Sequence, residues 1–266
     1  MRIDKLLYLR GLAKSREAAQ KMIRGGNTAV DGRVVTKPSL EVDDDCDIKI
    51  IGETLRYVSR GGLKLERALD AFSLDVTGLD CVDIGASTGG FTDCLLQHGA
   101  KRVRAVDVGR SQLDKTLEAD ARVTSYEGVN ARYITPDDIG GKCELVVCDV
   151  SFISLTLILP PVAGILGDDG RFVALIKPQF EAGRANIGKN GIVKDRGVHA
   201  EVIERVLDAA QACGLYCFGL TASPILGGDG NREYLAAFDR YGGYDKANIK
   251  KLAFEAQHTS PKKGRT

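Results

Sequence analysis

The chain has 266 residues, of which 44% are hydrophobic, and this is enough for one sizeable folded domain and a second, smaller one. Its longest apolar run contains two prolines and a glycine and falls short of the roughly 18 residues that a membrane-spanning helix needs, which argues against a membrane protein. The formal net charge of +1 indicates no particular partner by itself, so a preference for an anionic ligand must come from the distribution of charge.

The cysteines and the first residues indicate the cellular compartment. Seven cysteines are scattered along the chain, with an odd total and without a CxxC pair, which predicts reduced thiols and no metal site. The charged residues Arg2, Asp4 and Lys5 lie where a secretory signal would be apolar. Both observations favour a cytoplasmic protein.

Residues 1–52 are predicted to form a small α+β domain. Charged and apolar residues at helical spacing predict a helix over residues 2–9, and Ser15 can cap a second helix over residues 16–24. Asp31-Gly32 lies between two short strand-like segments, residues 28–30 and 33–35, and predicts a hairpin. A further strand is expected at residues 47–51.

Positive charge is concentrated in this first segment. Residues 1–40 hold nine lysines and arginines against three acids. A small basic domain joined to a nearly neutral body is typical of nucleic-acid binding. The residues of this domain predicted to contact RNA are Arg2, Lys5, Arg10, Lys14, Arg16, Lys21 and Arg24.

After a linker predicted at residues 53–58, residues 59–240 alternate strand-like and helix-like segments. The predicted strands are residues 79–84, 103–107, 123–127, 144–149, 171–176, 214–223 and 232–239, the last two forming a hairpin around residues 227–230. This order predicts an α/β fold, a Rossmann-like, doubly wound and mostly parallel sheet with helices on both faces. Residues 241–266 are expected to form a basic tail.

The run from Cys81 to Phe91 (CVDIGASTGGF) is the most informative motif. A dinucleotide fingerprint would have glycine at the position of Ser87, and no Gly-Lys-Ser/Thr is present to cradle a triphosphate. A second strand ends at Asp107, 24 residues after Asp83, close to the spacing at which a carboxylate reaches a ribose. A ribose-containing ligand without phosphate is therefore expected, and S-adenosylmethionine (SAM) is the best candidate.

The carboxyl ends of the strands are where such a sheet binds its ligand. We expect Asp107 to bind the ribose hydroxyls, Asn130 to face the adenine edge and Asp149 to lie near the methionyl end of SAM. The predicted cofactor-binding residues are Asp83, Gly85, Ser87, Gly89, Gly90, Phe91, Asp107, Val108, Asn130 and Asp149.

Two lysines occupy unusual places. Lys177 ends an apolar strand immediately before Pro178, and Lys64 lies in a helix that precedes the first strand of the sheet. Glu233 opens the last strand. A partly buried lysine loses the solvation that stabilises its charge, so Lys177 can be a base for a hydroxyl if a carboxylate orients it.

Together these segments resemble the TlyA family closely. The resemblance extends from residue 1 to about residue 240 and rests on the run from Cys81 to Phe91 and on SRGGLK (59–64), CDVSFIS (148–154), IKPQFE (176–181) and GNREY (230–234). Members of this family are ribosomal RNA 2′-O-methyltransferases with a catalytic domain of the FtsJ/RrmJ type, and they are often named haemolysins. Residues 1–52 resemble the RNA-binding domain of ribosomal small-subunit protein four.

The resemblance implies a SAM-dependent enzyme that acts on ribosomal RNA or ribosomal subunits without a metal. The family's catalytic Lys-Asp-Lys-Glu set falls on Lys64, Asp149, Lys177 and Glu233 without substitution. By this resemblance, Lys177 would deprotonate the ribose 2′-hydroxyl and Asp149 would orient it. Lys64 and Glu233 would hold the geometry and tune the charge.

Further RNA contacts are expected in the catalytic domain. The stretch from residue 180 to residue 196 combines glycines with cations and could close over the target nucleotide or bind phosphates. Arg60, Arg184 and Lys189 are the predicted cationic contacts. Phe152 and Phe180 could stack on a base, although either could equally belong to the core.

Three alternatives stay open from the residues alone. Gly85-Ala-Ser87-Thr-Gly89 also fits the nucleophile elbow of an esterase, with Asp149 as acid and His199 as base, although that fold sets several strands before its elbow. A binding protein could keep the cofactor fold without catalysis. A membrane-active haemolysin would need an apolar span or a strongly amphipathic basic helix, which the sequence lacks.

Overall fold

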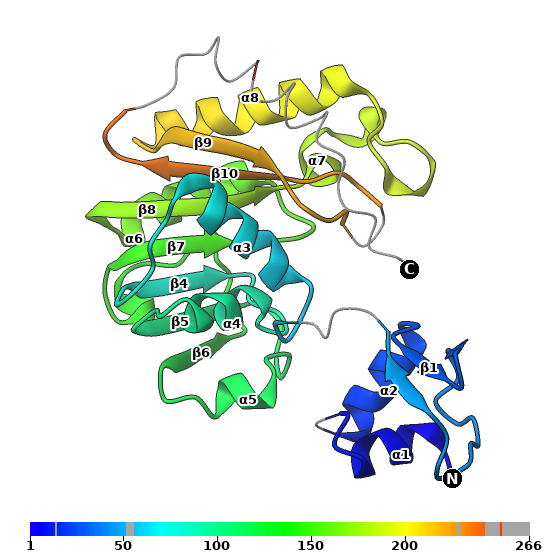
Figure 1. Cartoon of the computed structure of the whole chain (residues 1–266). Helices are drawn as coiled ribbons and strands as arrows, with labels where there is room; N and C mark the ends of the chain where they lie inside the picture. Colours follow the sequence, from blue (N-terminus) through cyan, green and yellow to red (C-terminus); the bar gives the residue numbers. More distant parts are fainter. Residues whose placement is uncertain (14, 52–55, 228–229, 243–250, 252–266) are drawn as a thin grey trace. The chain divides into compact units, whose positions relative to one another are not determined.

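The computed structural model describes residues 1–13, 15–51, 56–227, 230–242 and 251, in which the chain forms two compact units (Figure 1). One unit is Met1–Arg56 and the other begins at Tyr57. The predicted linker lies partly, and the predicted tail almost wholly, outside the described residues.

The first unit has two helices and a three-stranded antiparallel sheet. Its elements are α1 (Ile3–Leu9), α2 (Arg16–Arg24), β1 (Thr28–Val30), β2 (Arg33–Val35) and β3 (Ile48–Ile50), with the strands in the order β2-β1-β3. Asp31 and Gly32 both have positive φ, as the two-residue turn between paired strands requires, so the predicted hairpin is confirmed. The helices bury Ile3, Leu7 and Ile23.

The second unit contains a seven-stranded sheet in the order β6-β5-β4-β7-β8-β10-β9. Its strands are β4 (Asp80–Ile84), β5 (Arg102–Asp107), β6 (Val123–Glu127), β7 (Cys143–Cys148), β8 (Leu166–Ile176), β9 (Tyr216–Ala222) and β10 (Tyr234–Asp239). The first five strands in this order pair in parallel, and β10 is antiparallel to both β8 and β9. The predicted α/β fold with a mostly parallel sheet is confirmed.

Helices cover both faces of this sheet (Figure 1). One face packs against α3 (Gly61–Phe72), α4 (Gly90–Gln97) and α5 (Lys115–Glu118), and the other against α6 (Leu159–Ile165) and α8 (Arg196–Ala212). The shorter helical segments are η1 (Asp137–Ile139), η2 (Leu155–Leu157), α7 (Pro178–Glu181), η3 (Arg184–Asn186) and η4 (Lys189–Gly191). Neighbouring strand residues such as Cys81 and Val82 point to opposite faces, so apolar residues are needed on both.

Strand β8 differs most from the prediction, since it begins at Leu166 rather than at residue 171. The segment Gly167–Gly170 has the composition of a turn. Leu166 is nevertheless buried and pairs with Cys143 across a register irregularity, so tertiary pairing extends the strand through the glycines.

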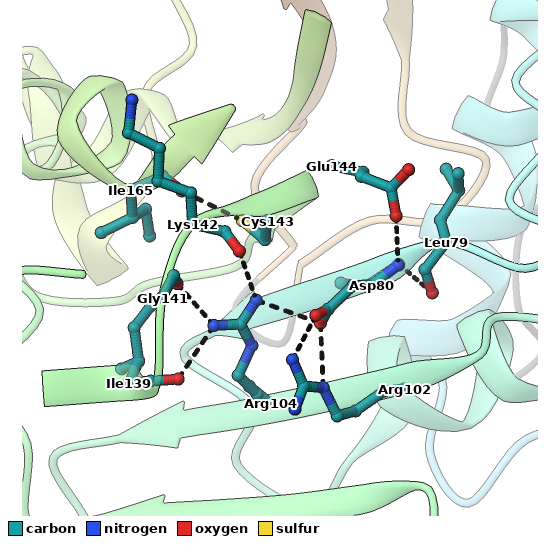
Figure 2. Close-up of polar contacts among 11 residues, drawn as sticks. Leu79, Asp80, Arg102, Arg104, Ile139, Gly141, Lys142, Cys143, Glu144 and Ile165 are labelled. Atoms are coloured by element: carbon teal, nitrogen blue, oxygen red, sulfur yellow. Dashed lines mark hydrogen bonds and ion pairs between the residues drawn. The ribbon is translucent and has the colours of Figure 1, made fainter. Parts of the chain in front are cut away.

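A buried arginine ties the central sheet to the loop before β7 (Figure 2). The Arg104 side chain is 1% exposed and donates to the backbone oxygens of Ile139, Gly141 and Lys142 at 2.6–3.1 Å. It also donates to Asp80 Oδ1 at 3.0 Å. A guanidinium remains charged when buried, so these acceptors compensate for its lost hydration.

Arg104→Ala is expected to lower the free energy of unfolding by about 3 kcal/mol, because one buried and two partly buried carbonyls lose their donor and Asp80 loses a partner. The matched control is Arg102→Ala, since Arg102 also pairs with Asp80 but its side chain is 47% exposed. This control should cost less than about 1 kcal/mol. Urea unfolding measures both changes, and equal losses would contradict the assigned role of Arg104.

Candidate active site

Acidic and basic side chains gather at one edge of the large sheet. Asp107 ends β5, while Asp149 and Lys177 directly follow the parallel strands β7 and β8. Strand β10 runs in the opposite direction, with Tyr234 paired to Ile176. The start of β10 therefore lies beside the end of β8, which places Glu233 next to Lys177 at the same edge.

Four of the predicted residues form one chain of ion pairs. Lys177 Nζ is 2.5 Å from Asp149 Oδ1, and Lys64 Nζ is 3.8 Å from Asp149 Oδ2. Lys64 Nζ also donates to Glu233 Oε2 at 2.7 Å. Both lysines and Glu233 are buried, and the Asp149 side chain is 19% exposed. Two cations and two anions compensate one another, as charges withdrawn from water require.

Lys64 reaches this cluster because the beginnings of α3 and α4 pack unusually closely. A Cβ on Gly90 would lie 2.2 Å from Ser59 Oγ and 3.0 Å from the Gly62 nitrogen. A Cβ on Gly62 would overlap the ring of Tyr57 at 2.2 Å. A larger side chain at Gly90 would push the two helices apart, and one at Gly62 would displace Tyr57, so both glycines help to set the position of Lys64.

The turn after β4 has the strained backbone that a ligand-binding turn needs. Gly85 has a φ of +81°, and a Cβ there would lie 2.6 Å from the Asp149 backbone oxygen. Ser87 has a φ of +49°, and its amide donates to Asp107 Oδ2 at 2.8 Å. Gly89, with a φ of +94°, precedes the first turn of α4. The backbone of this turn therefore contacts Asp107 directly at the edge of the sheet.

Asp83 is completely buried beneath this turn. Thr92 Oγ1 donates to its Oδ2 at 2.7 Å, whereas within the described residues its Oδ1 is buried without a hydrogen-bond partner. Burial raises the pKa of Asp83 to about 7, and the charge of Asp149 adds to this effect, while the bond from Thr92 opposes it. The buried carboxyl group therefore supports the start of α4 through Thr92.

A cavity of about 320 Å³ opens between these groups. Its lining includes Lys64, Asp149 and Lys177, together with the turn residues Gly85 to Thr88. A second, narrow cavity of about 10 Å³ shares Ala86 and Ser87 with it and includes Asp107. The larger cavity thus lies beside the charged cluster, and the smaller one, about the size of a water molecule, lies beside the end of β5.

Other predicted cofactor residues lie along the same edge. Phe91 and Gly90 line the larger cavity, and the Phe91 ring is buried. Asp107 Oδ1 accepts from the Gly109 amide at 2.7 Å. Val108 is 72% exposed. Asn130 closes a turn by accepting from the Arg132 amide at 3.1 Å.

Several cations predicted to bind RNA already have partners within the first unit. Arg2 and Arg16 both pair at 3.0 Å with Asp4, a fully buried carboxylate whose pKa they hold well below its usual range. Arg10 donates to the backbone oxygens of Asp44 and Cys46. These arginines therefore stabilise the unit.

The remaining predicted RNA contacts are placed as follows. Lys5 and Arg24 are exposed on α1 and α2, and Arg60 and Arg184 are exposed in the second unit. Lys14 and the side chains of Lys21 and Lys189 lie outside the described part of the chain.

Phe152 is a solvent-facing aromatic residue beside the charged cluster. It is 91% exposed and has a φ of +63°, which is rare for a bulky side chain. Its ring lies 5.0 Å from the ring of Phe180, which in turn lies 5.9 Å from Lys177 Nζ. Phe152 is thus not a core residue.

The geometry excludes the esterase interpretation. His199 is buried, with Nδ1 2.7 Å from Tyr234 Oη and Nε2 2.9 Å from the Val193 oxygen. Burial lowers the pKa of His199, and both of its ring nitrogens contact groups other than Ser87. Asp149, the supposed acid of the triad, pairs with two lysines instead.

Several residues of the site were not predicted from the sequence. Ser151 accepts from Lys177, and Thr92 donates to Asp83. Ser151 lies in the CDVSFIS segment, two residues after Asp149, and this proximity could have indicated that it belongs to the site. Ile225 and Leu226 line the cavity from the loop between β9 and β10, which only the folded topology brings there.

Comparison with known proteins defines the class of protein. Residues 57–240 match the FtsJ-like methyltransferase family, and residues 1–48 match the S4 domain. The fold, the glycine turn and these matches agree, so the chain is a methyltransferase with an N-terminal S4 domain. It belongs to the FtsJ-like methyltransferase family.

Individual relatives are similar over most of their length. YqxC of Bacillus subtilis, named as a candidate rRNA methyltransferase, is 50% identical over 88% of this chain and 84% of its own. The 16S/23S rRNA (cytidine-2′-O)-methyltransferase TlyA of Mycobacterium tuberculosis is 44% identical over 88% of this chain and 87% of its own.

A solved structure titled as a candidate hemolysin from Streptococcus thermophilus is also similar. It is 48% identical and superposes with a TM-score of 0.77, covering 97% of this chain and 95% of that one. In the described residues of the present chain, no helix is both long and apolar enough to span a bilayer. The resemblance to the TlyA family is confirmed.

The burial of Asp83 predicts a specific pH dependence of stability. Its carboxyl ionises near pH 3.8 in the unfolded chain but near pH 7 in the folded one, so stability should fall as the pH rises between these values. Asp83→Asn removes this loss. The difference in unfolding free energy between Asp83→Asn and the wild type, measured by urea unfolding without added ligand, should favour the variant more at pH 8 than at pH 5. An equal gain at both pH values would contradict the raised pKa.

Proposed function

We propose that this protein transfers a methyl group from SAM to a ribose 2′-hydroxyl in ribosomal RNA. The observation that carries the proposal is the buried chain of ion pairs from Lys177 through Asp149 and Lys64 to Glu233, which borders the larger cavity. It joins a lysine that can accept a proton to a carboxylate that can orient it, on the sheet edge where this fold binds ligands.

The residues around the two cavities fit SAM. Gly85 lines the larger cavity with bare backbone, and Asp107 borders the smaller one, where its carboxylate would receive ribose hydroxyls. Asn130 and Val108 would border the adenine, and Asp149 the methionyl end. When bound, SAM supplies an electrophilic methyl carbon. No step needs a metal ion in this proposal.

The remaining chemistry belongs to side chains of this chain. Once Lys177 has released its own proton to solvent, its neutral Nζ would take the proton of the 2′-hydroxyl as the oxygen becomes a nucleophile. Asp149 would hold Lys177 by their 2.5 Å ion pair, and Lys64, held by Glu233, would fix Asp149 from the other side. Placing the hydroxyl and its base together accounts for much of the expected rate enhancement.

The RNA would be bound by both units. The S4 domain, proposed to extend over residues 1–52, supplies the exposed cations Lys5 and Arg24, and Arg60 is exposed at the cavity itself. Phe152 is exposed next to Phe180 and would stack on a base of the target strand. Because ribosomal RNA is the substrate, we place the activity in the cytoplasm.

Lys177→Ala is expected to lower methyl transfer by about 100-fold or more, because the proton acceptor is removed, while affinity for SAM is retained. The assay uses tritiated SAM and ribosomal subunits that lack the modification. A 2′-O-methyl group blocks alkaline cleavage, so the label should remain in alkali-resistant dinucleotides. Calorimetry measures SAM binding.

The control for this assay is Lys142→Ala, which removes an exposed cation at the opposite end of β7 and should leave the rate unchanged. Methyl transfer by Lys177→Ala at the wild-type rate would contradict the role of Lys177. SAM binding without label in any subunit would favour a binding protein without catalysis.

Lys5→Ala combined with Arg24→Ala should weaken RNA binding and reduce the salt dependence of log Kd by about two, one for each lost phosphate contact. The control Lys101→Ala lies before β5, at the sheet edge away from the cavities, and should leave the slope unchanged. Filter binding across a salt series measures the slopes. An unaltered slope in the double variant would place the RNA contacts of this domain elsewhere.

A further inference from the structure

Lys177 has a second polar partner besides Asp149. Its Nζ donates to Ser151 Oγ at 2.8 Å, and Ser151 also lines the larger cavity. The Phe180 ring borders the amine at 5.9 Å. The lysine nitrogen is therefore held between a carboxylate, a hydroxyl and an aromatic ring, with the cavity on its remaining side.

The loop that carries Ser151 is fixed at both ends. At its beginning, the Asp149 amide donates to the Ile84 oxygen at 3.0 Å. At its end, Ser154 Oγ and the Leu155 amide donate to the two carboxylate oxygens of Glu181 at 2.6 and 2.7 Å.

Glu181 is buried and lies at the end of α7, four residues after Lys177. The short helix that follows the lysine thus anchors the loop that carries the serine. The distance between Ser151 Oγ and Lys177 Nζ is consequently set by structure on both sides.

The geometry points to Ser151 as a positioning residue that holds the Lys177 amine toward the bound ribose. This inference rests on the proposed function, since it gives Lys177 the role of proton acceptor. Its content is that the hydroxyl at position 151, rather than the Asp149 carboxylate alone, sets the direction in which the lone pair of the amine points.

The two partners of Lys177 differ in what they stabilise. A carboxylate attracts the charged ammonium form most strongly, whereas a hydroxyl oxygen accepts a hydrogen bond from either the charged or the neutral amine. Within the described residues, Asp149 Oδ1 lies close to Lys177 Nζ but accepts no hydrogen bond, whereas Ser151 Oγ does accept one. When Lys177 is neutral, the bond to Ser151 is therefore the contact that fixes one N–H and with it the direction of the lone pair. Ser151 itself neither gains nor loses a proton.

Loss of this contact should affect rate rather than binding. Ser151→Ala should lower the single-turnover rate of methyl transfer by about 10- to 100-fold at saturating RNA and SAM. The reason is that the Lys177 lone pair would no longer be held in the direction of the 2′-hydroxyl. The Kd values for SAM and RNA should remain at their wild-type values. Ser151→Thr keeps the hydroxyl and should restore the rate. Ser151 is exposed, so both variants are expected to fold.

A second measurement does not depend on activity. In protein labelled with ¹³C at lysine Cε, the Lys177 signal is assigned by its absence from Lys177→Arg. Ser151→Ala should increase the mobility of Lys177 Cε, and Ser151→Thr should reverse this increase. A purely structural role of Ser151 would instead change thermal stability without a selective effect on Lys177.

Each outcome decides the question. A wild-type rate in Ser151→Ala would overturn the inference, as would a Ser151→Thr variant that is as slow as Ser151→Ala. If the wild type transfers no methyl group to any ribosomal RNA, the proposed function fails. The Lys177 Cε signal then still tests whether Ser151 holds the Lys177 amine, and unchanged mobility in Ser151→Ala overturns that part of the inference as well.

Discussion

The mutual compensation of four charges, three of them buried and the fourth partly buried, is the interaction on which the site depends. Lys177, Asp149, Lys64 and Glu233 come from the ends of two parallel strands, the first turn of α3 and the start of β10. Removal of one charge would leave its neighbour uncompensated in a poorly solvated place. The cluster therefore holds together elements that are far apart in the sequence, and it does so at the edge where the cavity opens.

The reversal of β10 makes this cluster possible. A sheet of parallel strands alone brings only carboxyl ends to the ligand edge. Because β10 is antiparallel to β8, the residue before Tyr234 is brought to the same edge, and Glu233 meets Lys64 there. The close packing at Gly62 and Gly90 completes the arrangement by bringing the beginning of α3 over the turn after β4.

The first unit shows that a count of cations overstates the surface available to RNA. Asp4 is buried and shared by Arg2 and Arg16, and Arg10 binds backbone oxygens. A unit of this size buries little apolar surface, so it uses charged side chains for its own stability. Exposed cations such as Lys5 and Arg24 remain for phosphates.

The sequence by itself determined the sheet, the two-unit composition and the residues of the charged cluster, because strand periodicity, the glycine turn and the family motifs are local patterns. Tertiary structure decided which side chains meet. His199 turned out to be held by Tyr234 and Val193, Phe152 to face solvent, and Ser151 to contact Lys177. The contacts of His199 with Tyr234 and of Ser151 with Lys177 join residues 35 and 26 positions apart, and the exposure of Phe152 depends on how its loop is packed. A local sequence pattern encodes neither.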